Sequence, residues 1–159
     1  MTIVLYANRN TGLIALLYLL SRGYTVKIIT EDVAIRDMAD LLQLEVVDFD
    51  TMGEFDLLIC CHGRKIIDKK YLVPGKFLNI HPCLFKYKGH NPIKRYIENK
   101  DTLASVECQY LIEEVDGGAV IAREEFETPV ISDYAEFYNI AFPYYVKCLK
   151  AVLDLVGGP

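Results

Sequence analysis

The sequence predicts an α/β fold, a Rossmann-like, mostly parallel twisted sheet with helices on both faces. Short apolar, β-prone runs alternate with segments of helical periodicity, and polar residues follow several of these runs. Apolar residues make up 52% of the chain and charged residues 25%, which is typical of an ordered globular protein. A length of 159 residues suits one core, so we expect residues 1–159 to form a single domain.

The expected elements begin with a βαβ unit. "TIVLYA" (2–7) is a short β-prone run, "TGLIALLYLLSRG" (11–23) has helical spacing and ends at Gly23, and "YTVKIIT" (24–30) is a second strand. Asn10 or Thr11 is the expected N-cap of this helix. Next come an expected helix over 33–44, strands over 44–49 and 55–62, a short helix over 64–72 and a strand over 76–80.

The second half of the chain departs from this regular alternation. Residues 91–100 have a helical pattern with Pro92 in the first turn. Two extended segments, 103–112 and 119–130, flank "EEVDGG" and predict an antiparallel or mixed addition to the sheet. A long aromatic-rich helix is expected over 133–156, bent at Pro143.

Composition narrows the class of protein. A net charge of -5 argues against a nucleic-acid binder, because neutralising phosphates needs a basic face. The apolar run from Leu13 to Leu20 is far shorter than the ~20 residues of a membrane span, so we expect a cytoplasmic chain without membrane contact. The cysteines, five in number and without metal-ligand spacing, predict reduced thiols and no metal site.

Polar residues stand at the ends of three expected strands, where ligands bind in open α/β sheets: "ANRNTG", "CHGRK" and "NIHP". Asn79 and His81 are two residues apart and therefore project to the same side, where an amide and an imidazole could hold a developing oxyanion. Asp116 is the natural carboxylate to orient that imidazole and take a proton, because Gly117 and Gly118 let its loop bend sharply.

Other interpretations of these residues stay open. "ANRNTG" lacks the GxGxxG spacing of a dinucleotide loop, and a plain strand-to-helix turn explains it as well as anion binding does. Cys83, two residues after His81, allows a Cys/His nucleophile hypothesis. Asn79, His81 and Asp116 could each be an ordinary loop residue.

Two blocks in the right order carry a resemblance to a known family. "NIHPCLFKYKG", followed after a helix by "SVECQYLIEEVDGGAVI", resembles the folate-dependent formyltransferases, whose pattern is close to NIHPSLLPxYxG followed by TxHxxxxxxDxGxII. The family includes glycinamide ribonucleotide, methionyl-tRNA and amino-sugar formyltransferases. The resemblance is strongest from about Phe77 to Ile121, and it implies that residues 1–159 are a single formyltransferase catalytic domain.

By matching position, the resemblance implies an Asn79, His81 and Asp116 catalytic trio. It implies donor contacts along two matching segments, at Cys61, His62, Gly63, Arg64, Lys65 and Ile66 and at Ile112, Glu113, Val115 and Gly117. Acceptor contacts are expected at Asn8, Arg9, Asn10, Lys86, Tyr87, Lys88, Gly89 and Gln109. The sequence departs from the pattern at Cys83 for Ser, at Phe85 and Lys86 for Leu-Pro, and at Gln109, where a further His is common.

The resemblance implies that 10-formyltetrahydrofolate is the formyl donor and that a primary amine is the acceptor. An amino-sugar nucleotide is the favoured acceptor, because tRNA-specific members carry a further C-terminal domain for RNA and this chain is acidic. Two alternatives stay open: a 10-formyltetrahydrofolate hydrolase, which would use the same trio with water, and a catalytically weak module that binds folate or a nucleotide. Assembly as a homodimer is also left open.

Overall fold

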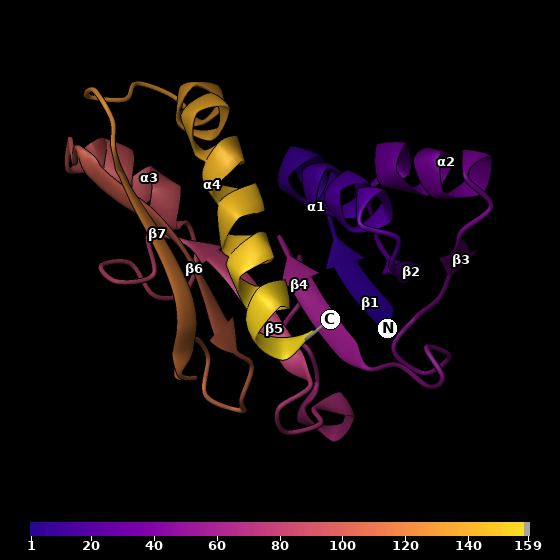
Figure 1. The fold of residues 1–159 in the computed structure, drawn as a ribbon. Helices are drawn as coiled ribbons and strands as arrows, with labels where there is room; N and C mark the ends of the chain where they lie inside the picture. The colour runs from indigo at the N-terminus through magenta and orange to yellow at the C-terminus, as the bar shows by residue number, and fades with distance from the viewer. Residues whose placement is uncertain (158–159) are drawn as a thin grey trace. The chain divides into compact units, whose positions relative to one another are not determined.

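The computed structural model describes residues 1–157 and shows an α/β fold with seven strands in the order β3-β2-β1-β4-β5-β6-β7 (Figure 1). The predicted fold class, a mostly parallel sheet with helices, is confirmed. The chain divides into two compact units, Met1–Asn79 and Ile80–Pro159, and β5 (Phe77–Pro82) runs across their boundary. The expectation of one domain stays a prediction.

Unit 1 is built on parallel strands. It contains β1 (Thr2–Ala7), α1 (Arg9–Ser21), β2 (Thr25–Ile29), α2 (Val33–Leu41), β3 (Glu45–Val46), β4 (Leu57–Cys61) and the 3-10 turn η1 (Lys69–Tyr71). β1 pairs in parallel with β2 and β4, and β2 with β3. All residues from Ile3 to Ala7 are fully buried, as expected for a strand covered on both faces. Gly12 lets α1 approach β1, because a Cβ there would lie 2.8 Å from the Ala7 Cβ.

Three expected elements of unit 1 are shorter than predicted. The helix expected over 33–44 ends at Leu41, because Gln43 takes a left-handed φ of 55° and Leu44 N–H returns to the Ala39 carbonyl. The strand expected over 44–49 is only β3, since the Asp48 carboxylate accepts the N–H of Asp50 and forms a turn. The helix expected over 64–72 is only η1, capped by Asp68.

The N-cap of α1 is Asn8, so the prediction of Asn10 or Thr11 is wrong. The Asn8 side chain makes no hydrogen bond to the helix, because its amide binds the His62 carbonyl and the Glu31 N–H.

Unit 2 contains α3 (Pro92–Glu98), the antiparallel pair β6 (Leu103–Tyr110) and β7 (Val120–Glu127), and α4 (Tyr134–Val156). The predicted antiparallel addition is confirmed. α4 passes through Pro143 and buries Phe137, Tyr145 and Leu149 on one face. Aromatic packing fills the unit: the Phe126 and Tyr144 rings stack 4.0 Å apart.

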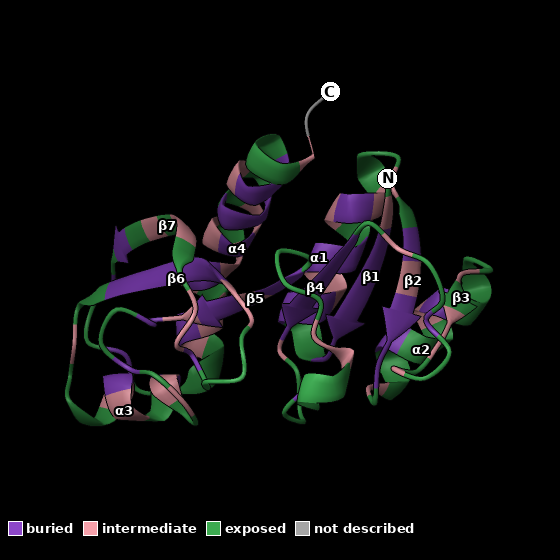
Figure 2. Ribbon diagram, turned by 90° about the horizontal axis from the view of Figure 1, so that it is seen from below, coloured by how far each residue is buried: buried purple, intermediate pink, exposed green. Residues whose placement is uncertain are grey.

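Burial is concentrated in the strands. Figure 2 shows β1, β4 and β6 almost entirely as buried residues, in agreement with the fully buried Leu58, Ile59, Ala104 and Val106. All five cysteines are buried too. No helix within residues 1–157 has the length and apolar character that a membrane span needs.

Candidate active site

The His81 ring lies against Asp116 in unit 2. Nε2 of His81 is 3.3 Å from Oδ2 of Asp116, and both side chains are buried. The other ring nitrogen, Nδ1, is 2.8 Å from the Pro82 carbonyl, and Nε2 also lies 3.4 Å from the Gly89 carbonyl. All of these partners are acceptors, so they are satisfied together when both ring nitrogens carry a hydrogen. Both ring nitrogens of His81 therefore face acceptors of the protein.

Asp116 sits on the loop between β6 and β7 with a left-handed φ of 53°. Its Oδ2 accepts the Gly89 N–H at 2.6 Å, and its Oδ1 accepts Nε2 of Gln109 at 2.7 Å. The hydrogen bond from His81 is the main cause that lowers the pKa of Asp116 to about 2, against the opposing effect of burial. The carboxylate is therefore ionised at neutral pH.

Gln109 is fully buried and donates a hydrogen bond from its side-chain amide to Asp116. Turning its amide over would place Oε1 against the carboxylate, so the orientation is set by charge. Among the described residues, Oε1 has no hydrogen-bond partner. A neutral amide thus occupies the position where a further His is common in the formyltransferase pattern, and this amide still donates a hydrogen bond to Asp116.

Asn79 lies two residues before His81 on β5 and is partly exposed between the buried Leu78 and Ile80. Alternation along a strand turns the Asn79 and His81 side chains to the same face. Its role in an oxyanion site stays a prediction.

Glu107 is a buried carboxylate that the sequence interpretation missed. On β6 and fully buried, it accepts the N–H groups of Leu84 and Phe85 at 2.8 and 2.9 Å and the Ser105 hydroxyl at 2.7 Å. Nε of Arg123 lies 3.3 Å away. Glu107 therefore fixes the turn after His81, and its signal was a single acidic residue inside an apolar strand pattern.

The loop over residues 86–89 is held by contacts with Asp101, His81 and Asp116. Tyr87 is buried and donates its hydroxyl to Asp101, which also binds Nζ of Lys86 at 2.7 Å. Gly89 belongs to the His81 and Asp116 site through its backbone. Lys88 is exposed and is the cation of this loop that remains for a ligand.

The segment over residues 112–117 presents apolar side chains beside Asp116. Ile112 is 46% exposed and Val115 54%, and Glu113 is exposed as well, while Gly117 N–H binds the Glu114 carbonyl at 3.1 Å. Exposed apolar side chains of this kind suit contact with a ring of a ligand. Their contact with a donor stays a prediction.

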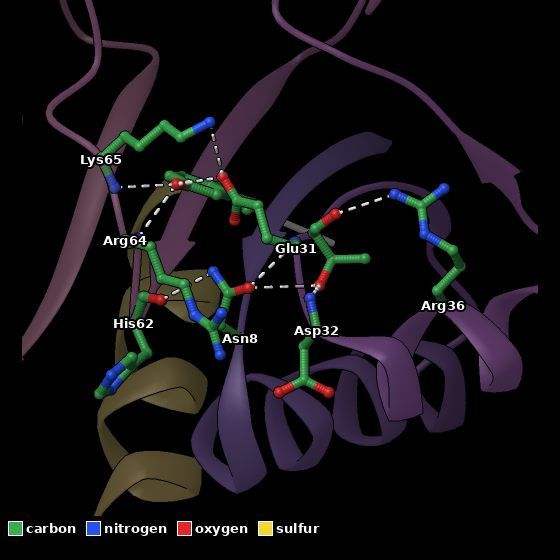
Figure 3. A network of polar contacts seen from close by, with 9 residues as sticks. Asn8, Glu31, Asp32, Arg36, His62, Arg64 and Lys65 are labelled. Atoms are coloured by element: carbon green, nitrogen blue, oxygen red, sulfur yellow. Dashed lines mark hydrogen bonds and ion pairs between the residues drawn. The ribbon is translucent and has the colours of Figure 1, made fainter.

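In unit 1, Asn8 ties the ends of β1, β2 and β4 together (Figure 3). Its Nδ2 donates to the His62 carbonyl at 3.0 Å, and its Oδ1 accepts the Glu31 N–H at 3.0 Å. Asn8 is fully buried and its amide is bound inside the unit, which disfavours a contact with an acceptor, and that contact stays a prediction.

Arg9 and Asn10 are exposed at the start of α1. The Arg9 N–H already donates to Oδ2 of Asp32 at 3.0 Å, and this bond is the largest cause that lowers the pKa of Asp32. A carboxylate of the protein thus occupies part of the helix terminus. The exposed side chains of Arg9 and Asn10 are what remains there for an acceptor.

Cys83 does not suit the role of a nucleophile. It is fully buried, and burial raises the pKa of its thiol to about 12, with the nearby Glu107 charge acting in the same direction. A thiol in this state stays protonated at neutral pH and is inert. The Cys/His hypothesis is therefore disfavoured.

Comparison with known proteins identifies the family of this chain. Residues 23–139, well over half of the chain, match the family described as formyl transferase. The chain belongs to this family. Over 146 residues it is 27% identical to the methionyl-tRNA formyltransferase of Borrelia turicatae, which covers 89% of this chain and 47% of that protein. The chain thus spans about half the length of this relative.

Two solved structures show the same fold. The N-formyltransferase of Helicobacter canadensis, in complex with folinic acid and dTDP-3-aminofucose, matches with a TM-score of 0.84 and 18% identity over 98% of this chain and 63% of that one. The formyltetrahydrofolate deformylase of Burkholderia mallei matches with a TM-score of 0.76 and 14% identity over 98% of this chain and 65% of that one. At these identities the likeness extends to the fold.

Proposed function

We propose that this formyltransferase family member moves a formyl group from 10-formyltetrahydrofolate to a primary amine. The observation that carries the proposal is the buried pair of His81 and Asp116, with two acceptors on one ring nitrogen and a third on the other. Such a pair is built to keep an imidazolium in place, and an imidazolium is suited to a developing oxyanion. Family membership supplies the reaction class.

In the proposed reaction the amine nitrogen attacks the formyl carbon and a C–N bond forms. The carbonyl electron pair moves to oxygen, and the resulting oxyanion is stabilised by His81 and by the Asn79 amide, an effect of about 2.7 to 4 kcal/mol per well-placed donor. The bond between this carbon and N10 then breaks, N10 takes up a proton, and tetrahydrofolate leaves. No covalent bond to the protein forms.

The proton released by the amine needs an acceptor. Asp116 can receive it directly or through water, but a carboxylate with a pKa of about 2 is a weak base. We therefore assign Asp116 mainly to holding the His81 ring in place, and the amine proton passes to solvent or to N10 before tetrahydrofolate leaves.

For the acceptor we propose an amino-sugar nucleotide. The likeness in fold to a structure solved with dTDP-3-aminofucose supports this class. Exposed Arg9, Asn10 and Lys88 offer donors to an anionic group. The methionyl-tRNA relative makes tRNA the competing acceptor. The net charge of -5 disfavours it, because tRNA binding needs phosphate neutralisation.

The fold likeness to a deformylase supports a second candidate, hydrolysis of the same donor with water as the nucleophile. The two reactions share the proposed trio and differ in what occupies the acceptor position.

Donor binding is tested by calorimetry with folinic acid, a stable 5-formyl analogue of the donor. We expect saturable binding and a higher melting temperature, because a ligand that binds only the folded state stabilises it by mass action. A nicotinamide dinucleotide serves as the control ligand. Binding of the dinucleotide without binding of folinic acid would move the chain to a dehydrogenase-like role.

A further inference from the structure

The tyrosine hydroxyl at the end of β1 binds the loop that follows β4. The Tyr6 oxygen accepts the N–H groups of Arg64 and Lys65, both at 3.0 Å, and donates to Oε1 of Glu31 at 3.1 Å. A tyrosine hydroxyl has one hydrogen to donate and two lone pairs to accept with, so these partners use its full capacity. Burial raises the pKa of Tyr6 to about 12, which keeps the hydroxyl protonated at neutral pH.

The loop lies directly on the Tyr6 ring. A Cβ at Gly63 would be 2.8 Å from Cε1 of Tyr6 and 2.7 Å from Sγ of Cys60, so only glycine fits at this point. The preceding residue, His62, has a left-handed φ of 65°, a conformation that is strained for a non-glycine residue. The surrounding structure must therefore hold this backbone in place.

Glu31 connects the same loop to the end of β2. Its carboxylate accepts the Tyr6 hydroxyl and lies 3.8 Å from Nζ of Lys65, while its N–H binds the Asn8 amide. Asn8 in turn binds the His62 carbonyl. Residues 62–65 are thus held at one carbonyl by the Asn8 side chain and at two N–H groups by the Tyr6 hydroxyl, and all three contacts join a side chain to the backbone of the loop.

We propose that Tyr6, steadied by Glu31, is a positioning residue for the formyl donor: its hydroxyl fixes the backbone of residues 62–65 in the conformation that receives the pterin ring. The inference rests on the proposed function, because contact between this loop and a folate is itself proposed. The exposed side chains of Arg64, Lys65 and Ile66 would then be presented by a loop that is ordered before the donor arrives.

A loop that is ordered before the donor binds raises the affinity for the donor more than it changes the rate of the chemical step. A loop that must be ordered by its ligand costs part of the binding free energy, whereas the saturated enzyme has the loop ordered in either case. Loss of the Tyr6 hydroxyl should therefore weaken donor binding and leave kcat at saturating donor unchanged. Loss of a residue that mattered only for folding would not weaken donor binding while leaving kcat unchanged.

The test compares Tyr6→Phe with the original chain by calorimetry with folinic acid, by steady-state kinetics and by amide hydrogen exchange. We expect the dissociation constant to rise about tenfold, because two N–H groups lose their acceptor. Exchange at the Arg64 and Lys65 amides should rise at least ~10-fold, since their opening is no longer opposed by the hydroxyl. The kcat at saturating donor should stay within about twofold.

Matched variants distinguish loss of the Tyr6 hydroxyl contacts from a general loss of stability. Tyr71→Phe removes another tyrosine hydroxyl bonded to a carboxylate of unit 1, that of Asp50, and should leave folinic acid affinity unchanged. Glu31→Gln keeps an acceptor for the Tyr6 hydroxyl and should bind nearly as the original chain does, whereas Glu31→Ala should bind about threefold more weakly. Glu31→Ala also carries the test if Tyr6→Phe fails to fold.

Two results would overturn the inference, and they differ from failure of the proposed function. If Tyr6→Phe and Glu31→Ala bind folinic acid as tightly as the original chain, the hydroxyl does not position the donor, even if amide exchange rises. Failure of the unmodified chain to bind folinic acid would appear before any variant is made, and it would remove the proposed function and the inference together.

Discussion

Replacing His81, Asn79 or Asp116 by alanine is expected to lower turnover at least ~100-fold each while folinic acid still binds. The reason is that the oxyanion exists only along the reaction path, so groups that stabilise it affect kcat more than affinity for the ground state. His81→Ala should have the largest effect, because the His81 ring is the group proposed to face the oxyanion and Asp116 acts through it. Single-turnover kinetics combined with calorimetry measure the two quantities separately.

Asp116→Ala needs a stability check beside the kinetics. The Gly89 N–H and Nε2 of the buried Gln109 both donate to Asp116, and the substitution leaves both without that acceptor. Assays should therefore run well below the melting temperature of this variant. Double variants of the trio should lose less than the product of the single losses, as expected for residues that act as one unit.

Cys83→Ser is the internal control for this prediction. It restores the residue that is usual in the family pattern, and the buried, protonated thiol predicts little change in turnover. The proposed trio would be contradicted if Cys83→Ser were inactive while His81→Ala and Asp116→Ala stayed active. That result would favour the hypothesis of a Cys83 nucleophile.

Gly118→Ala is expected to lower the free energy of unfolding by at least about 3 kcal/mol, which corresponds to a fall of about 10 °C in Tm. A Cβ at Gly118 would lie 1.8 Å from the Tyr110 carbonyl oxygen. That atom belongs to the backbone at the end of β6, and the neighbouring Tyr110 N–H binds the Ala119 carbonyl at 3.0 Å. The loop that carries Asp116 would have to move away from β6.

Gly117→Ala provides the matched control one position earlier. A Cβ there would be 2.7 Å from Cδ of Glu114, but this neighbour is the end of an exposed, flexible side chain that can rotate away. We expect its Tm to change by no more than about 2 °C. Equal Tm values for both variants in thermal denaturation would mean that the close approach at Gly118 does not constrain the loop.

Much of the fold could be predicted because it depends on local periodicity. β1 was predicted at its observed bounds, and the long α4 was predicted to within one residue, since buried strands and amphipathic helices leave regular apolar patterns. The helix expected over 64–72 is shortened to η1, and the segment before it makes non-local contacts. The N–H groups of Arg64 and Lys65 bind the Tyr6 hydroxyl, a residue far away in sequence that local periodicity does not include.

The candidate site was predictable only in part for the same reason. His81 and Asp116 could be paired because both carry recognisable sequence motifs, and the structure brings them into contact. Glu107 and Tyr6 looked like ordinary strand residues, because their importance comes from backbone groups of other segments that fold against them. Asn8 was expected at the acceptor, yet its buried amide ties strand ends together.

We propose that this chain transfers a formyl group from a folate to an amine. The most direct test measures tetrahydrofolate release from 10-formyltetrahydrofolate with and without a panel of amino-sugar nucleotides. We predict release that depends on an acceptor, with the formyl group recovered on its amine, and no such release by His81→Ala. Loss of formyl at the same rate without any acceptor would contradict transfer and indicate a hydrolase, and no turnover with any acceptor, despite folate binding, would indicate a binding module.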